Sequence, residues 1–177
     1  RKIINFMNLI IFGPPGAGKG TQADFIVHNF NLYQLSTGEI LRNEIKNKTS
    51  LGNEISSIIN SGSLVSDEIV KKLVESFISK NEYKNRLVFD GYPRNLIQAK
   101  TLDELLSKYS QKIDLVLKLS VSLETIKKRI SERKTLEKRE DDSEEIAIKR
   151  YETYEKSTEP VIEYYKKLNL LKVIEGE

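Results

Sequence analysis

The feature that most constrains the fold is a glycine-rich segment, GPPGAGKGTQ from Gly13 to Gln22, which directly follows the apolar run MNLIIF. Glycines let backbone N–H groups turn inward around phosphate oxygens, and a helix that begins at such a loop adds a partial positive charge. The order of apolar run, glycine loop, lysine and helical pattern is that of a nucleotide-binding P-loop. Most P-loops have Ser or Thr after the lysine to bind Mg²⁺. This chain has Gly20 there and a threonine one place later, at Thr21.

Five short apolar runs alternate with longer amphipathic segments along the chain. We expect these runs to be strands, at residues 7–12, 32–35, 86–89, 113–119 and 170–174. Strands that alternate with helical patterns predict a parallel sheet with helices on both faces, and ligands bind such sheets at the carboxyl ends of the strands. The expected fold is α/β, a five-stranded parallel sheet of the P-loop NTPase type.

Two segments interrupt this alternation. Residues 37–79 contain three helical patterns and are expected to form a helical insertion. Residues 133–142, RKTLEKREDD, are mostly charged and lie between two helical patterns, where we expect a lid. The rest forms the core of one domain, expected at residues 7–36, 80–132 and 143–177. Residues 1–6, before Met7, are interpreted as an N-terminal extension or an expression remnant.

The composition excludes several classes of function. With 177 residues, 38% hydrophobic and 31% charged, the chain is expected to fold as one compact domain. It contains no cysteine, which excludes disulfides and a cysteine-based zinc site and fits a reducing compartment. The single His28 rules out a histidine-based metal cluster. We expect no signal peptide and no membrane span, because no cleavage site follows the first apolar run and no run approaches about 20 residues.

Arginine is used sparingly. Of 29 basic residues eight are arginine, and a guanidinium grips phosphate with two parallel hydrogen bonds, which lysine cannot do. Six arginines follow strand ends or surround the charged segment: Arg42, Arg94, Arg129, Arg133, Arg139 and Arg150. Together they predict a polyanion site. The net charge of +3 suits such ligands but is small for a nucleic-acid binder.

Two further motifs follow expected strands. DGYPR, residues 90–94, places Asp90 at the end of a strand near the P-loop, where P-loop enzymes have their Mg²⁺-side carboxylate. STGEILR, residues 36–42, caps a helix and places Arg42 about one turn along it. We expect Arg42 and Arg94 to reach the same ligand.

GPPGAGKGTQ, STGEILR, LVSDEIV, DGYPRNLIQA and KREDDSEEIAIKRYETY together resemble the adenylate kinase family, in order from Met7 to Glu177. That family has glycine after the P-loop lysine, which accounts for Gly20. The resemblance implies reversible, Mg²⁺-dependent phosphoryl transfer, ATP + AMP to two ADP, by a cytoplasmic monomer with no nucleic-acid or membrane partner. It implies Mg²⁺ held by phosphates and water, with Asp90 behind the water, whereas the absence of cysteine excludes the family's zinc-bearing lid.

The resemblance also assigns roles to single residues. ATP would be bound by Gly13, Pro14, Gly16, Ala17, Gly18, Lys19, Gly20, Thr21, Arg129 and Arg133. AMP would be bound by Thr37, Gly38, Arg42, Leu64, Val65, Gly91, Arg94, Gln98, Arg139 and Arg150. The catalytic cations would be Lys19, Arg94, Arg129, Arg133, Arg139 and Arg150. Asp141 and Asp142 resemble the aspartate pair that orders these arginines as the lid closes.

Elementary chemistry agrees with this assignment. A phosphate acceptor is already an anion near neutral pH, so no general base is needed. The repulsion between two polyanions must instead be overcome by fixed positive charge in a site without water. Only KTLEK separates Arg133 from Arg139, which leaves open whether the lid is short or residues are missing there. The family's closing helix has no counterpart after VIEGE.

Three alternatives compete with this interpretation. A UMP/CMP-type pyrimidine nucleoside monophosphate kinase resembles this family in fold, but Gln98 favours adenine because an amide can pair with its donor and acceptor edge. A P-loop switch would not need a second phosphate site. A nucleic-acid binder would interleave aromatic with basic residues, whereas half of the eight tyrosines cluster in YETYEKSTEPVIEYY, where packing is expected.

Overall fold

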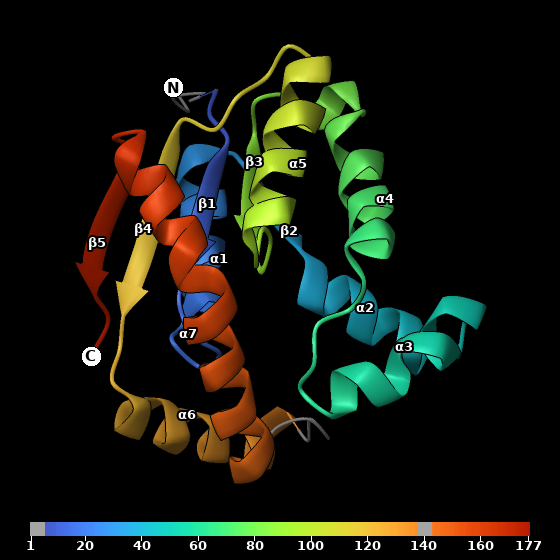
Figure 1. The fold of residues 1–177 in the computed structure, drawn as a ribbon, viewed down its shortest axis with the longest axis vertical. Coiled ribbons are helices and arrows are strands. Elements are labelled where there is room, and N and C mark those ends of the chain that lie inside the picture. The colour runs from blue at the N-terminus through green and yellow to red at the C-terminus, as the bar shows by residue number, and fades with distance from the viewer. Residues whose placement is uncertain (1–5, 138–142) are drawn as a thin grey trace.

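The computed structural model describes residues 6–137 and 143–177 (Figure 1). Within these residues, five strands form one sheet: β1 (Leu9–Phe12), β2 (Tyr33–Ser36), β3 (Leu87–Asp90), β4 (Leu115–Ser120) and β5 (Leu171–Glu175). The strand order is β2-β3-β1-β4-β5, and all neighbours are parallel. The predicted five-stranded parallel sheet is therefore confirmed, with strand ends slightly displaced.

The register of the sheet brings the polar strand ends together. β1 lies between β3 and β4, with Ile11 opposite Asp90 on one side and Leu117 on the other. Ser36, the last residue of β2, is also opposite Asp90. Every residue of β1 and β3 is buried, as expected for strands covered on both faces.

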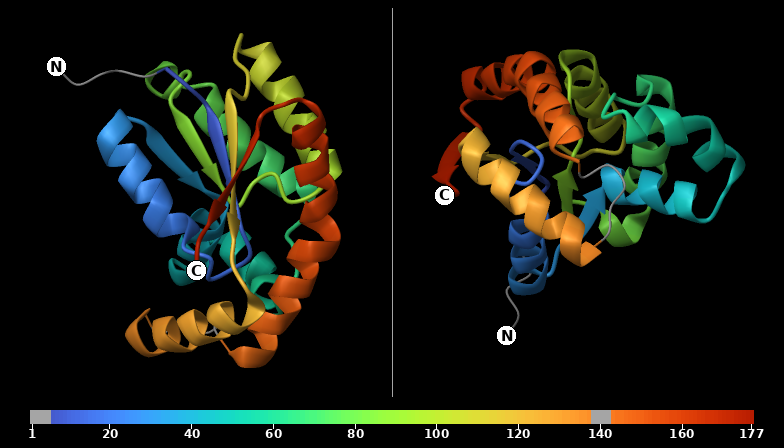
Figure 2. Two further views of the ribbon diagram at one scale, coloured as in Figure 1. Left: turned by 90° about the vertical axis from the view of Figure 1, so that its left-hand side faces the viewer. Right: turned by 90° about the horizontal axis from the view of Figure 1, so that it is seen from below.

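Helices cover both faces of this sheet (Figure 2). On one face lies α1 (Lys19–Phe30), and on the other lie α5 (Leu96–Lys108) and α7 (Glu144–Lys167). Alternate residues of β1 pack into the hydrophobic cores on the two faces of the sheet, because successive side chains of a strand point to opposite faces. Leu9 and Ile11 pack with α1, and Ile10 packs in the larger core.

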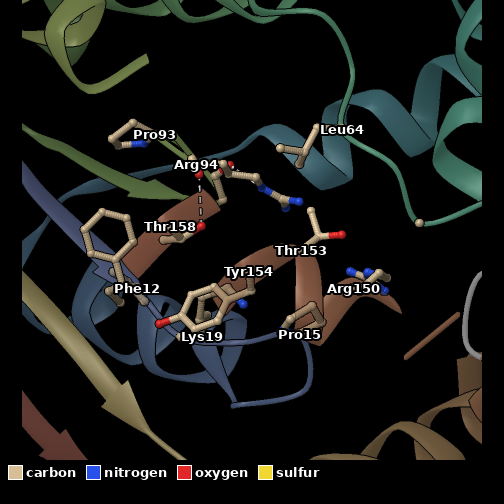
Figure 3. Close-up of a pocket in the computed structure, with 14 residues that line it drawn as sticks. Phe12, Pro15, Lys19, Leu64, Pro93, Arg94, Arg150, Thr153, Tyr154 and Thr158 are labelled. Atoms are coloured by element: carbon tan, nitrogen blue, oxygen red, sulfur yellow. Dashed lines mark hydrogen bonds between the residues drawn. The ribbon is translucent and has the colours of Figure 1, made fainter. Parts of the chain in front are cut away.

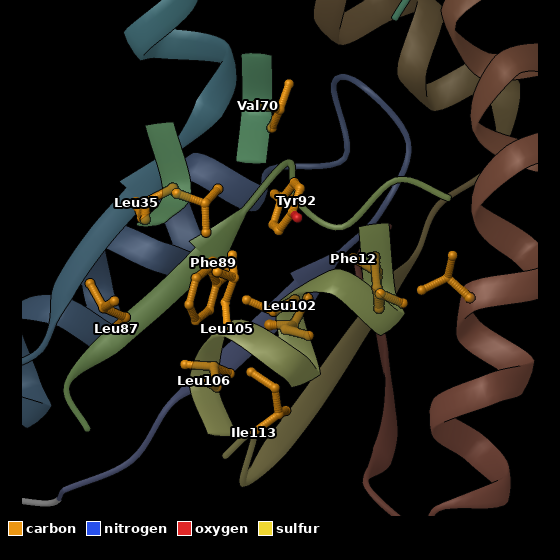
Figure 4. Packing of buried hydrophobic residues seen from close by; sticks show 14 of the residues in the cluster. Phe12, Leu35, Val70, Leu87, Phe89, Tyr92, Leu102, Leu105, Leu106 and Ile113 are labelled. Atoms are coloured by element: carbon orange, nitrogen blue, oxygen red, sulfur yellow. The ribbon is translucent and has the colours of Figure 1, made fainter. Parts of the chain in front are cut away.

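The larger core joins the sheet to α5 and α7 (Figure 4). Phe89 of β3 and Leu102 of α5 are completely buried, and each such side chain contributes about 1.5–3 kcal/mol through burial. Tyr165 on α7 is also completely buried. The tyrosine cluster of the sequence is thus at least partly a packing feature, as predicted.

Three helices fill the interval expected for the insertion: α2 (Thr37–Lys46), α3 (Ser50–Asn60) and α4 (Asp67–Ile78). Each begins after a hydroxyl side chain that accepts a hydrogen bond from a backbone N–H of the first turn, at Ser36, Thr49 and Ser66. In Figure 1, α2 and α3 project away from the sheet, whereas α4 runs beside α5. A 3₁₀ turn (Asn81–Tyr83) then leads to β3.

The helix after β4, α6 (Leu123–Glu137), lies below the carboxyl ends of the strands in Figure 1. The lid was expected from residue 133, but α6 continues to Glu137. Within its last turns, Thr135 Oγ1 donates to the carbonyl of Ser131 at 3.3 Å. The rest of the expected lid, including Arg139, Asp141 and Asp142, lies outside the described residues. Within the described ranges, no helix has the length and apolar character needed to cross a membrane.

Candidate active site

The glycine loop between β1 and α1 has the geometry of an anion cradle. Gly16 and Gly18 have φ angles of 83° and 92°, in the left-handed region that favours glycine. Ala17 N donates to the carbonyl of Pro14 at 3.0 Å, which closes the turn. No side chain caps α1, which begins at Lys19, so its first N–H groups remain available to an anion.

Lys19 extends from this loop into a cationic environment. Its Nζ donates to the carbonyl of Pro14 at 3.2 Å. Burial lowers the pKa of Lys19 to about 8; Asp90 opposes the shift, and Arg94, Arg150 and Arg133 add to it. A buried lysine with arginines nearby is suited to bind a polyanionic ligand.

The largest cleft lies at the carboxyl ends of the strands and has an empty volume of about 1510 Å³, open solvent included. The predicted ATP residues that line it are Gly16, Gly18, Lys19, Gly20, Thr21, Arg129 and Arg133. Gly13 lines a neighbouring cavity instead. Pro14 and Ala17 do not line the cleft; their carbonyls accept from Lys19 and Arg129. The donor half of the predicted site is thus assembled around one cleft.

A second cavity lies on the insertion side, with an empty volume of about 550 Å³, open solvent included. The predicted AMP residues that line it are Thr37, Gly38, Arg42, Leu64, Val65, Gly91, Arg94, Gln98 and Arg150. Arg139, the remaining member of that set, lies outside the described residues. The structure therefore brings together segments that are far apart in the sequence.

A third cavity, of about 530 Å³, lies between the glycine loop and α7 (Figure 3). Gly91, Arg94 and Arg150 line this cavity and also both of the others. In Figure 3, Lys19, Arg94 and Arg150 come from three separate segments and surround the same space. Two ligands, one in each of the larger cavities, would meet at these cations.

Arg94 is held in place by three hydrogen bonds. Its Nε donates to the carbonyl of Gly91 at 2.7 Å, its backbone N–H donates to Gln98 Oε1 at 2.7 Å, and its carbonyl accepts from Thr158 Oγ1 at 3.0 Å. Burial lowers the pKa of Arg94; Asp90 opposes this shift and Arg42 adds to it. The guanidinium stays protonated because its ordinary pKa is so high.

Gln98 is 3% exposed and uses both ends of its amide. Besides accepting from Arg94 N, it donates from Nε2 to Asp67 Oδ1 at 2.7 Å. Asp67 had no predicted role, although it lies within LVSDEIV. Its sequence signal is an acidic residue at the start of an expected helix. This pattern is common, because negative charge is favourable there, and does not by itself indicate a function.

Asp90 lines the large cleft and is 8% exposed. Its Oδ2 accepts a hydrogen bond from Gln34 Nε2 at 3.1 Å. Gln34 also lines the cleft and was missed from the sequence; the only sign of it was a polar residue inside an expected strand. Among the described residues, no three His, Cys, Asp or Glu side chains cluster as metal ligands. A single oriented carboxylate suits a metal held through water.

Arg129 and Arg133 both lie on α6 and line the large cleft, as their spacing predicted. Arg129 also has backbone partners: it donates to the carbonyl of Ala17 at 3.3 Å and to that of Gly176 at 2.7 Å. The guanidinium therefore joins the glycine loop to the segment after β5. Arg86, the first residue of the segment expected to form the strand at 86–89, stacks on Tyr33 and donates to the carbonyl of Asn31.

Comparisons with known proteins agree with this geometry. The adenylate kinase family model matches residues 11–170. An adenylate kinase of Pelagibacter ubique is 44% identical over 196 aligned positions, which cover 96% of this chain and 92% of that protein. One of Fusobacterium nucleatum is 42% identical over 192 positions, covering 96% and 91%. One of Bifidobacterium longum is 42% identical over 170 positions, again covering 96% and 91%.

The lengths of these alignments are informative. The first two alignments are longer than the 177-residue chain itself, so those relatives contain residues that have no counterpart here. The alignment with the Bifidobacterium protein is no longer than this chain. On the match across residues 11–170 and these identities, the chain belongs to the adenylate kinase family.

Proposed function

We propose that ATP occupies the large cleft, that AMP occupies the cavity on the insertion side, and that the phosphoryl group passes between them beside Lys19, Arg94 and Arg150. Family membership makes the chain a nucleoside monophosphate kinase with adenylate kinase activity. The observation that carries the site assignment is the sharing of Arg94 and Arg150 by both cavities. Two nucleotides held in this way have their phosphates directed at each other.

Catalysis in this arrangement is electrostatic. The acceptor is an anion, so the residues need to hold two phosphate chains in line and to stabilise the charge that moves between them. Lys19 contacts the transferred group, and Arg42 and Arg94 bind the AMP phosphate. Arginine contacts that strengthen in the transition state contribute several kcal/mol each, as the roughly 10³–10⁵-fold effect of an arginine finger indicates. Arg129, Arg133 and the lid segment exclude water from the transfer.

Asp90 is the residue that we propose to hold Mg²⁺, through a water molecule. Its burial, the hydrogen bond from Gln34 and its place in the phosphate cleft support this role. When bound, Mg²⁺ would supply positive charge that offsets the negative charge of the ATP phosphates. Gln34 keeps the carboxylate oriented. We propose no zinc site.

Gln98 is proposed to recognise the base. Its amide has two lone pairs on oxygen and two hydrogens on nitrogen, and the protein uses one of each. The remaining lone pair and hydrogen suit the N6 amino group and N1 of adenine. The relatives reported above are all named adenylate kinase, and no contact in the cavity favours a pyrimidine acceptor.

We further infer a cytoplasmic monomer that acts on ATP, AMP and ADP without nucleic-acid or membrane partners. Support comes from the absence of cysteine, which suits a reducing compartment. Sedimentation analysis with and without nucleotides tests the monomer; a stable dimer would contradict it.

The test of the activity is an assay with ATP and each of AMP, CMP, UMP and GMP, with and without Mg²⁺. We expect rapid diphosphate formation with AMP alone, abolished by chelation of Mg²⁺. Preference for CMP or UMP would overturn the base assignment. Hydrolysis of ATP without phosphorylation of any acceptor would contradict the proposed site.

A matched pair of variants tests the acceptor cavity. Arg42→Lys keeps the charge but loses the two-pronged contact, so KM for AMP is expected to rise by about 10- to 100-fold while KM for ATP changes little. Arg86→Lys is the control, because Arg86 lies outside all three cavities. Equal effects of the two substitutions on KM for AMP would contradict the assignment.

A further inference from the structure

We propose that Asp67 is a specificity-determining residue: it fixes the orientation of the Gln98 amide and so restricts the acceptor to bases with an amino group beside a ring-nitrogen acceptor. The inference rests on the proposed function, because it requires that Gln98 faces the base of the acceptor nucleotide. It assigns to the insertion a part in choosing the base, in addition to holding the phosphate.

Three polar side chains link the start of α4, in the insertion, to the start of α5, in the core. Asp67 is the first residue of α4, Asn95 is the N-cap of α5, and Gln98 lies in the first turn of α5. Asp67 Oδ1 accepts from Gln98 Nε2 at 2.7 Å and from Asn95 Nδ2 at 3.0 Å. Asn95 Oδ1 in turn accepts from the backbone N–H of Gln98 at 2.8 Å. The carboxylate is therefore itself held in place.

The two partners of the Gln98 amide leave it one orientation. The backbone N–H of Arg94 can only donate, so it must face the amide oxygen, at 2.7 Å. An ionised carboxylate can only accept, so Asp67 must face the amide nitrogen. Rotating the amide by half a turn would set donor against donor and acceptor against acceptor. Arg94, whose guanidinium binds the acceptor phosphate in the proposed function, thus also helps to fix the group that recognises the base.

A fixed amide distinguishes two classes of base. Adenine presents an amino hydrogen at N6 next to the acceptor N1, which matches the remaining oxygen lone pair and N–H of Gln98. Hypoxanthine, guanine and uracil present an oxygen next to a ring N–H, which is the reverse pattern and would require the amide to turn over. Cytosine has the same pattern as adenine, so its rejection depends on the size of the base and is independent of Asp67.

The substitution Asp67→Asn tests this inference. An asparagine at this place can accept or donate, so it no longer fixes the Gln98 amide, and only the backbone N–H of Arg94 still opposes the reversed orientation. We expect the ratio of kcat/KM for AMP to that for its 6-oxo analogue IMP to fall by about tenfold or more, the effect of one mispaired hydrogen bond. The ratio of AMP to CMP is expected to stay within about twofold of its wild-type value, since both bases pair with the same amide orientation.

Glu68→Gln is the matched control. Glu68 lies in the same first turn of α4 and is exposed, so this variant removes the same kind of charge from the helix N-terminus. We expect it to leave the AMP-to-IMP ratio unchanged. If Asp67→Asn does not fold, Asp67→Ala removes the acceptor of Gln98 Nε2 by another route and is expected to lower the same ratio.

Each outcome decides one question. An unchanged AMP-to-IMP ratio in a folded Asp67 variant, or an equal loss of kcat/KM with all acceptors, overturns the inference while leaving the adenylate kinase activity in place. A fall in the ratio that Glu68→Gln reproduces also overturns it. If the wild-type protein shows no AMP phosphorylation, the proposed function has failed and the inference fails with it.

Discussion

Lys19 carries its charge in a buried position among arginines, and this placement makes its protonation sensitive to pH and to bound phosphate. With its pKa lowered to about 8, the free enzyme loses this cation at a pH where ordinary lysines remain protonated. Bound phosphate reverses the effect, because a nearby anion favours the charged amine.

We therefore expect kcat/KM for ATP to fall tenfold per pH unit above about pH 8, since kcat/KM reports the free enzyme. The fall in kcat should begin at higher pH, because the bound phosphates raise the pKa of Lys19. The measurement is a pH–rate profile from pH 6 to 10 at constant ionic strength. Lys19→Arg, although slower, should lack the inflection near pH 8. A wild-type profile that stays flat to pH 10 would contradict the prediction.

At the scale of elements, the insertion depends on the close approach of α2 and α3 at Gly52. A Cβ atom at this position would lie 2.0 Å from the carbonyl oxygen of Glu44 and 2.7 Å from the backbone N of Ile45. Both contacts are with backbone, so the helices themselves would have to separate. Thr37 and Arg42 lie on α2, and any shift of that helix moves them within the acceptor cavity.

Gly52→Ala is accordingly expected to destabilise the protein by about 1–3 kcal/mol, as overpacking does, and to raise KM for AMP more than KM for ATP. Urea unfolding and steady-state kinetics measure the two effects. Ser57→Ala, at an exposed position of the same helix, serves as the control and should change neither. Wild-type stability in Gly52→Ala would show that α2 and α3 adapt without cost.

The elements that depend on local sequence were predictable, and those that depend on tertiary contacts were not. LIIF and LVF are apolar without alternation, and this alone indicates strands buried on both faces. By contrast, the pairing of Asp67 with Gln98 joins residues 31 positions apart, and that of Gln34 with Asp90 joins residues 56 apart. Neither pairing has a local pattern. The end of α6 was misplaced because its charged residues suit a helix as well as a loop.

Among the site residues, the glycine loop and the arginines were predictable because phosphate chemistry demands particular residue types. The additional bonds that hold those residues were not. Arg129, for example, donates to Ala17 and Gly176, and nothing in its neighbouring sequence indicates either carbonyl. Arg94 was predicted from DGYPR, but its support by Thr158 comes from a helix 64 residues further on.

At the scale of the whole molecule, positive charge is concentrated in one place. The net charge is only +3, yet Lys19, Arg94, Arg133 and Arg150 lie close enough for the arginines to lower the pKa of the lysine. Repulsion within this group opposes folding in the absence of an anion. The thermal stability of the unliganded protein should therefore depend on how well an anion fits this group of cations, and not only on the ionic strength.

Inorganic phosphate is expected to raise Tm above the value in sodium chloride of equal ionic strength. For a protein of this size, each kcal/mol of stabilisation by binding raises Tm by about 2–4 °C. Thermal unfolding across a phosphate titration provides the measurement. Arg94→Met should reduce the increment, because it removes a cation common to all three cavities. Identical Tm values in the two salts would show that the cations do not form an anion site.

In the strand order β2-β3-β1-β4-β5, the strand that precedes the glycine loop, β1, lies at the centre of the sheet. Different additional segments follow the strands on its two sides. The insertion follows β2 on one side, and α6 follows β4 on the other. The residues proposed to bind the acceptor and those proposed to bind ATP thus come largely from separate stretches of the gene, with Arg42, Arg94 and Arg150 lining both cavities. Substitutions at Asp67 and Gln98, which do not line the large cleft, are therefore expected to change the choice of acceptor base while the cleft proposed for ATP is inherited intact.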